Sequence, residues 1–190
     1  MFLRDIPLTN LYGIDVMDEF VEICKDTFNS SNFSITNPFP PTQFENNFFD
    51  YVVGYSVFSH LSEQACLEWM REFYRIVKPG GIVALTTRGR PFFDYCESLK
   101  GQNKGQYADS LSTMFPSFDE AKKSYDEGRF VHSNADGVTG NGQSHAYFYG
   151  ETFIPEEYAR SAYAELFTLE EFIYDSERQS HPIMFFKRLG

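Results

Sequence analysis

Three stretches of the sequence carry side chains that could bind or act on a ligand. Asp15 lies at the end of the apolar run 11–16, and a carboxylate at a strand end can accept two hydrogen bonds from the hydroxyl groups of a ribose. The loop 37–44 holds three prolines, which make it rigid, and it could form a wall against a flat base such as adenine. Segment 56–61 leaves the most apolar stretch of the chain and contains His60. The alternative for Asp15 is a carboxylate that caps a helix or is only solvated.

The first half of the sequence predicts a fold that brings such strand ends together. Helices are expected to begin at caps Asp18 and Ser62, each followed by apolar residues at three- and four-residue spacing. The run 48–58 has the aromatic and β-branched content of a central strand buried on both faces. This order of elements predicts an α/β fold with a doubly wound, Rossmann-like, mostly parallel sheet, where ligands bind outside the carboxyl ends of the strands. Four runs are predicted strands: 11–16, 33–36, 48–58 and 82–87.

The second half of the sequence is less regular. Residues 100–142 are rich in Gly, Asn, Ser and Lys, which indicates either a lid or substrate loop or a loosely ordered insertion. We expect a single domain over 1–190, with a core at 11–90, a variable insertion at 91–145 and a closing helix and strands at 146–190. Helices are predicted over 91–99, over 117–127 and from Pro155, and strands over 146–153, 168–174 and 183–188.

Composition excludes several classes of function. Lys and Arg total 16 against 27 Asp and Glu, a net charge of −11 at pH 7, so nucleic acid, which needs a basic surface, is not expected as a partner. The sequence has no signal peptide and no apolar run of about 20 residues that would span a membrane. The scattered Cys24, Cys66 and Cys96 fit neither a disulfide framework nor a CxxC metal site and favour a reducing cytoplasm.

The order of these features resembles one protein family. The segments GIDV, NPFPPTQFENNFFDYVVGYSVFSHL and IVKPGGIVALTTRG, within about 11–89, are similar to the class I S-adenosylmethionine-dependent methyltransferases. The tail YGETFIPEEYARSAYAELFTLEEFIYDSERQSHPIMFFKRLG resembles the antiparallel closing hairpin of a small-molecule subgroup. The resemblance implies a methyltransferase sheet with an antiparallel C-terminal hairpin and S-adenosylmethionine as cofactor. It makes 11–90 the cofactor side and 91–145 the substrate side.

The resemblance also implies roles by position. Asp15 matches the acid that holds the cofactor's ribose, with Val16 and Met17 beside the adenine. Asn37 and Pro38 fall where a polar or acidic residue usually meets the adenine amino group. Tyr55 and Ser56 match the strand end that, in the family, lies under the methionine portion of the cofactor. The expected cofactor-binding residues are Asp15, Val16, Met17, Asn37, Pro38, Tyr55 and Ser56.

On the substrate side the resemblance implies Phe58 and His60, and His145 is a weaker candidate at the rim. A general base with a pKa near 7 assists methyl transfer to a hydroxyl, and His60 is the candidate; the alternative is a histidine that hydrogen-bonds the start of a helix. His132 and His181 are expected to be surface or structural. The spacing of His132 and His145 fits no metal signature, so we expect no metal. The expected reaction is O- or N-methylation of a small molecule, such as a sugar or a secondary metabolite.

One part of the family pattern is missing. The family's first strand and a GxGxG loop precede the ribose-binding acid, whereas MFLRDIPLTN holds no glycine. Three explanations stand: an N-terminally truncated domain, completion by another chain through strand exchange or a homo-oligomer, or a degenerate relative. The alternative functions are a non-catalytic methyltransferase-like scaffold and, with less support, a nicotinamide-dependent dehydrogenase, whose GxGxxG motif is also absent.

Overall fold

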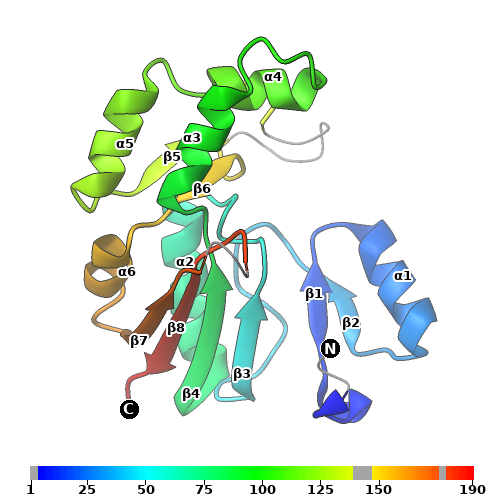
Figure 1. Cartoon of the computed structure of the whole chain (residues 1–190). Coiled ribbons are helices and arrows are strands. Elements are labelled where there is room, and N and C mark those ends of the chain that lie inside the picture. Colours follow the sequence, from blue (N-terminus) through cyan, green and yellow to red (C-terminus); the bar gives the residue numbers. More distant parts are fainter. Residues whose placement is uncertain (1–3, 139–146, 176–178) are drawn as a thin grey trace. The chain divides into compact units, whose positions relative to one another are not determined.

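The computed structural model of the chain describes residues 4–138, 147–175 and 179–190 (Figure 1). The chain divides into two compact units, Met1–Gln43 and Phe44–Gly190. Both units combine helices with strands, which confirms the predicted α/β class. The single domain expected over 1–190 stays a prediction.

The first unit is a strand–helix–strand motif. β1 (Gly13–Asp15) and β2 (Phe33–Ile35) pair in parallel and are joined by α1 (Asp18–Phe28). Gly13 pairs with Phe33, and a Cβ at Gly13 would lie 2.6 Å from the Phe33 ring, so a side chain there would push the ring away. The predicted first strand and the helix that follows it are therefore confirmed, with the strand shorter than its apolar run.

Asp18 does not cap α1, contrary to the sequence prediction. The N-cap is Met17, without a side-chain cap hydrogen bond, and Asp18 is the first helical residue. The Asp15 carboxylate instead accepts the Met17 N–H at 2.8 Å and so tightens the turn from strand to helix. Asp18 acts through its charge, because an anion in the first turn is favoured by the helix dipole.

The second unit is built on a four-stranded sheet of order β3-β4-β8-β7. β3 and β4 are parallel, whereas β8 runs antiparallel to both β4 and β7. The antiparallel C-terminal hairpin that the sequence predicts is therefore confirmed. The strands are β3 (Phe49–Gly54), β4 (Val77–Thr86), β7 (Phe167–Ile173) and β8 (Ile183–Arg188).

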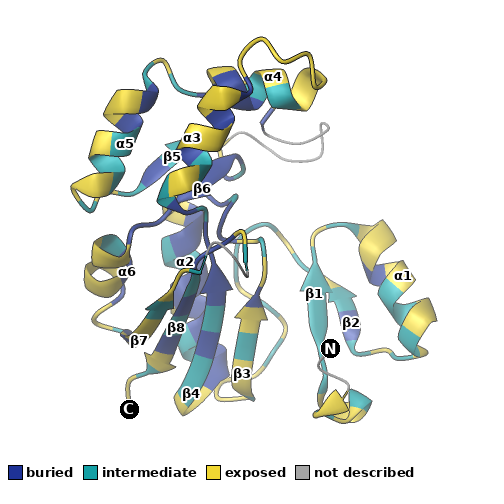
Figure 2. Ribbon diagram, viewed as in Figure 1, coloured by how far each residue is buried: buried dark blue, intermediate teal, exposed yellow. Residues whose placement is uncertain are grey.

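The prediction that run 48–58 forms a central strand buried on both faces is wrong. Among the described residues β3 pairs only with β4, so it lies at the edge of its sheet. Tyr51 and Val53 are 67% and 51% exposed, while Gly54 is buried (Figure 2). The error has a physical reason: an apolar, β-branched run shows that a segment prefers the strand conformation, but not how many strands lie beside it.

Two helices flank the strands of this sheet. α2 (Glu63–Ile76) begins at Ser62, whose hydroxyl accepts the Ala65 N–H at 3.4 Å as the predicted cap. Its buried face includes Met70. α6 (Glu156–Ala162) follows Pro155, as predicted. No helix in the described ranges is both long and apolar enough to cross a bilayer.

The remaining elements of the second unit form what we call the cap. Figure 1 shows them gathered at the carboxyl ends of β3 and β4. α3 and α5 confirm the predicted helices, whereas α4 and β5 were not predicted, and the loosely ordered alternative for 100–142 is wrong as far as Val138. The cap consists of α3 (Arg90–Ser98), α4 (Gln106–Thr113), α5 (Phe118–Asp126), β5 (Val131–Ser133) and β6 (Glu151–Phe153).

Segment 148–154, which contains β6, ties the cap to the sheet. It lies between the loop after β3 and the loop after β4, with backbone hydrogen bonds to both. This anchoring places β6 side chains against residues at the ends of two sheet strands. The bonds run from Ser62 to Phe148, Gly150 to His60, Thr152 to Ser59 and Arg88 to Thr152, at 2.7 to 3.2 Å.

The cap has its own apolar core, which a substitution can test. The fully buried Phe93 of α3 stacks on Phe153 of β6, with ring centroids 3.7 Å apart. Phe93→Ala should lower the free energy of unfolding by about 3–5 kcal/mol, because it leaves a cavity in the packed core. Urea unfolding followed by the fluorescence of the single Trp69 measures this loss.

Tyr95→Ala is the matched control on the same helix. Its side chain is half exposed, so the expected loss is about 1 kcal/mol or less. Equal losses in the two variants would contradict the assignment of Phe93 to the core of the cap.

Candidate active site

A buried carboxylate lies at the centre of the second unit. Glu151, the first residue of β6, is fully buried. Its Oε2 accepts the Arg88 Nε–H at 2.8 Å, and its Oε1 accepts the Tyr107 hydroxyl at 2.6 Å. A buried charge is costly unless it is paired and hydrogen-bonded, and both conditions are met here. Three parts of the chain, the loop after β4, α4 and β6, therefore meet at one side chain.

Arg88 extends this network toward the C-terminal hairpin. Its Nη1 donates to Nε2 of the buried His181 at 2.7 Å, because a guanidinium has no acceptor. Burial, and then the charge of Arg88, lower the pKa of His181. The guanidinium also lies 4.2 Å from the centroid of the Phe92 ring, in a cation–π contact. His181 is therefore a buried structural residue; the sequence had left open whether it is structural or lies at the surface.

His60, the predicted base, lies against the same carboxylate. Its Nδ1 is 2.8 Å from the Gly150 carbonyl and 3.4 Å from Glu151 Oε1. A carbonyl oxygen only accepts, so Nδ1 carries the proton and Nε2 keeps its lone pair. The ring stacks on Tyr149, with centroids 5.0 Å apart and planes within 3°. Burial lowers the pKa of His60 despite the opposing effect of Glu151. Burial therefore favours the neutral imidazole, with its lone pair on Nε2.

His132 forms a second fixed imidazole nearby. Thr152 donates its hydroxyl hydrogen to the Leu61 carbonyl at 2.7 Å, so its oxygen accepts Nδ1–H of His132, also at 2.7 Å. Burial lowers the pKa of His132 to about 4. Nε2 of His132 is buried without a hydrogen-bond partner among the described residues. His145, the other predicted candidate, lies outside the described residues.

The end of β3 carries two predicted cofactor-binding residues. Ser56 has a φ of +56°, which a non-glycine residue rarely adopts, and its N–H donates to the Thr86 hydroxyl at 2.7 Å. The exposed Tyr55 lies near His181, with ring centroids 5.8 Å apart. Phe58 is 1% exposed and packs on Phe73, so the substrate-side role predicted for it has no exposed side-chain surface to support it.

A cavity of about 420 Å³ opens beside this network, within the cap. Two of its lining residues, Arg88 and Tyr107, are the direct partners of Glu151. The network and the cavity therefore share a wall. The cavity is lined by Arg88, Phe92, Tyr95, Leu99, Lys104, Tyr107, Ala108 and Leu111.

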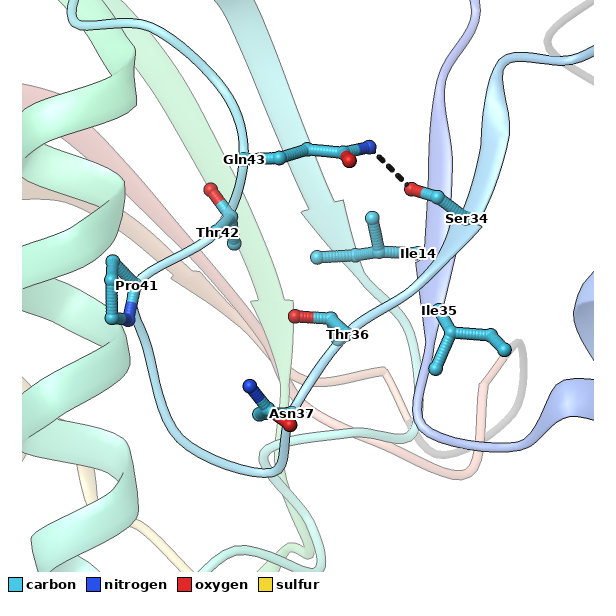
Figure 3. A pocket seen from close by; sticks show the side chains of 8 residues that line it. All are labelled: Ile14, Ser34, Ile35, Thr36, Asn37, Pro41, Thr42 and Gln43. Carbon is cyan, nitrogen blue, oxygen red and sulfur yellow. Dashed lines mark hydrogen bonds between the residues drawn. The ribbon is translucent and has the colours of Figure 1, made fainter.

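The first unit has a smaller cavity of about 240 Å³ at the end of β2 (Figure 3). Of the predicted cofactor-binding residues, Asn37 lines it, whereas Asp15, Val16, Met17 and Pro38 are not among its lining residues. Gln43 crosses its edge and donates from Nε2 to the Ser34 hydroxyl at 2.7 Å. The cavity is lined by Ile14, Ser34, Ile35, Thr36, Asn37, Pro41, Thr42 and Gln43.

The segment before β1 has no glycine-rich loop in its described part. Instead it forms a 3-10 turn, η2 (Leu8–Asn10). Nδ2 of Asn32 binds the Leu8 and Leu11 carbonyls at 3.2 and 3.1 Å, which fixes this turn beside β2. Three or more His, Cys, Asp or Glu side chains placed to hold a metal ion are not found in the described ranges.

Sequence reasoning missed Glu151 and Arg88, and it did not connect Tyr107 to them. Glu151 lies 63 residues from Arg88 and 44 from Tyr107, so no local spacing connects them. One signal was present: Glu151 falls in an apolar, aromatic stretch predicted as a strand, where an acid is rarely buried without a partner.

Comparison with known proteins found a family model that is similar to part of the chain. A family model described as a methyltransferase domain matches residues 2–85, which include the first unit, β3, α2 and most of β4. A sequence comparison with curated proteins found no match.

Several solved structures share the fold. One is titled a SAM-dependent methyltransferase from Methanosarcina mazei: identity is 17%, TM-score is 0.56, and the match covers 94% of this chain and 81% of that one. PH0226 from Pyrococcus horikoshii OT3 has 15% identity and a TM-score of 0.55, and the match covers 94% of this chain and 71% of that one. A chain of a Haloferax volcanii complex, which joins the Trm112 methyltransferase activator to a methyltransferase, has 10% identity and a TM-score of 0.54. The match covers 100% of this chain and 75% of that one. Identities this low show similarity of fold alone.

The lowered pKa of His132 makes stability depend on pH. Between its ordinary pKa of about 6.5 and the folded value of about 4, the unfolded chain binds more protons than the folded one, so acidification favours unfolding. Because of the titration of His132, the free energy of unfolding should fall by about 2 kcal/mol when the pH is lowered from 7 to 5. Urea unfolding at both pH values measures the change.

His132→Asn retains an N–H donor for Thr152 but does not titrate. The variant should therefore lose about 2 kcal/mol less than the parent over the same pH step. Equal losses in parent and variant would contradict the burial of a neutral imidazole at this position.

Proposed function

We propose, on the premise that this chain is a class I S-adenosylmethionine-dependent methyltransferase, that it methylates a small molecule held by its second unit. The observation that carries this proposal is the methyltransferase-domain match over residues 2–85. The aromatic cavity of the cap supports a small-molecule acceptor, because a site of this size suits a ligand of that class. The net charge of −11 argues against RNA or DNA as the acceptor.

For the cofactor, we propose that Asp15 binds the ribose hydroxyls and that the first-unit cavity receives the base. That cavity is smaller than the roughly 300–1,000 Å³ of sites that enclose a whole ligand, so it suits only part of the cofactor. The polar side chains around it, including Asn37, suit a heterocycle that carries donors and acceptors. We assign the neighbouring Val16, Met17 and Pro38, and Tyr55 and Ser56 at the end of β3, to the same cofactor.

For the reaction, we propose that His60 accepts the proton of a hydroxyl acceptor. S-adenosylmethionine, when bound, would supply an electrophilic methyl group for transfer from its sulfur to the acceptor oxygen. The lone pair on Nε2 of His60 takes the released proton, and Glu151 near Nδ1 stabilises the imidazolium that results. The protein otherwise orients the reactants and excludes water. An amine acceptor would need the same base, so N-methylation remains within the proposal.

We further propose a cytoplasmic homo-oligomer. Cys24, Cys66 and Cys96 are free thiols, as suits a reducing compartment. In the described residues β3 pairs on one side only, and an exposed edge of this kind can accept a strand from another chain. Size-exclusion chromatography with light scattering tests this assembly, and a monomer at all concentrations would contradict it.

Asp15→Ala should weaken the binding of S-adenosylhomocysteine by about tenfold or more, because hydrogen bonds to a charged acceptor are lost. Titration calorimetry measures the affinity. Asp18→Ala removes the same charge three residues later and should leave the affinity nearly unchanged. Equal effects would contradict the ribose assignment, and no binding by the parent chain would favour the non-catalytic scaffold.

His60→Gln should lower kcat by about 10²–10⁴-fold, the usual contribution of a general base. Its affinity for S-adenosylhomocysteine should not change. Transfer of a labelled methyl group from S-adenosylmethionine to a panel of phenols, sugars and amines measures kcat. His132→Asn is the control for altering a buried imidazole, and an equal loss in both variants would argue that His60 is structural.

A further inference from the structure

The cap cavity has an unusual lining for so acidic a chain. Both charged residues among its eight lining residues are cations, Arg88 and Lys104, and none is an acid. The chain as a whole carries a net charge of −11. The wall of this cavity is therefore a local exception to the acidic surface, and a ligand that uses it should itself be anionic.

The two cations are not equivalent. Arg88 is compensated by the buried Glu151, and its Nη1 is bonded to His181, so the pair adds no net charge. Lys104 is exposed and forms no ion pair with any residue in the described ranges. Lys104 thus provides the net positive charge of the wall. Its ammonium group has three donors to offer an anion.

The other walls of the cavity are flat and apolar. Phe92 and Tyr95 stack with centroids 5.6 Å apart and planes within 27°, and Tyr107 adds a third ring. Tyr95 and Tyr107 are about half exposed, so a bound ligand could cover their rings and remove apolar surface from water. Leu99 and Leu111 supply an apolar floor. A flat ring is the shape that such walls cover best, by stacking and by edge contacts.

We propose that this cavity binds an aromatic carboxylate, with the ring between the aromatic walls and the carboxylate at Lys104. The hydroxyl of Tyr107 is committed to Glu151, so its ring is fixed in place as a wall. Arg88 and Tyr107 of the lining bind the Glu151 carboxylate, which lies 3.4 Å from His60, so the cavity is connected to the predicted base only through Glu151. The role of this ligand as methyl acceptor rests on the proposed function; its binding does not.

The test compares an acid with its neutral analogue. 4-Hydroxybenzoate and 4-hydroxybenzamide have the same ring and nearly the same size but differ in charge. Titration of each into the full chain, without S-adenosylmethionine and followed by NMR, should give an affinity about three- to tenfold higher for the acid, as expected for one partly exposed charged hydrogen bond. Equal affinities, or no binding of either probe, would overturn the proposal.

Substitutions locate the charge and the ring. Lys104→Gln should remove the preference for the acid, while Lys100→Gln, a neighbouring exposed lysine outside the lining, should keep it. Ala108→Phe fills the cavity from α4 and should abolish binding of both probes. Loss of the preference in Lys100→Gln as well, or binding retained in Ala108→Phe, would place the ligand elsewhere and overturn the assignment.

This inference and the proposed function fail in different ways. Binding of 4-hydroxybenzoate that depends on Lys104, in a chain without affinity for S-adenosylhomocysteine, would uphold the cavity and overturn the methyltransferase activity. Intact S-adenosylhomocysteine binding without any binding of 4-hydroxybenzoate would overturn the cavity assignment alone.

Discussion

The pairing of the buried Glu151 carboxylate is the constraint on which the second unit depends. A carboxylate without solvent contact must be matched by donors, and here they come from Arg88 after β4 and Tyr107 in α4. These three residues lie on elements far apart in sequence, so the charge can be satisfied only when the cap is docked on the strand ends. The backbone bonds of segment 148–154 to both loops provide the scaffold that holds β6 in this position.

How much of this could be predicted differs between local and long-range features. Local signals predicted the N-cap Ser62, the helix α5 after Ser117 and the two closing strands, because each is set by a few adjacent residues, whereas the antiparallel pairing of those strands was implied by the family resemblance. The same signals failed for β3, since the number of its neighbours is a property of the whole sheet. They missed α4, whose sequence QYADSLST is polar and weakly periodic, and which is held by packing against α3.

The candidate site divides in the same way. His60 could be chosen from the sequence because it follows a predicted strand end, the usual place for a ligand in such sheets. Its partners could not be chosen, since Gly150 lies 90 residues away and Glu151 joins it only through the folded cap. Phe58, two residues before His60, is buried because the turn after β3 directs it toward Phe73. Two positions of one motif therefore differ in burial, and no spacing rule distinguishes them.

The cap also decides the chemistry of the predicted base, beyond covering it. In water the two nitrogens of a neutral imidazole share the proton, and its pKa lies near 6.5. The Gly150 carbonyl fixes the proton on Nδ1, and the burial that follows from docking lowers the pKa of His60. The Gly150 carbonyl belongs to segment 148–154, so the tautomer of His60 with its lone pair on Nε2 depends on the docked cap. Docking of the cap therefore sets which nitrogen of His60 carries the lone pair, and it adds burial that favours the neutral ring.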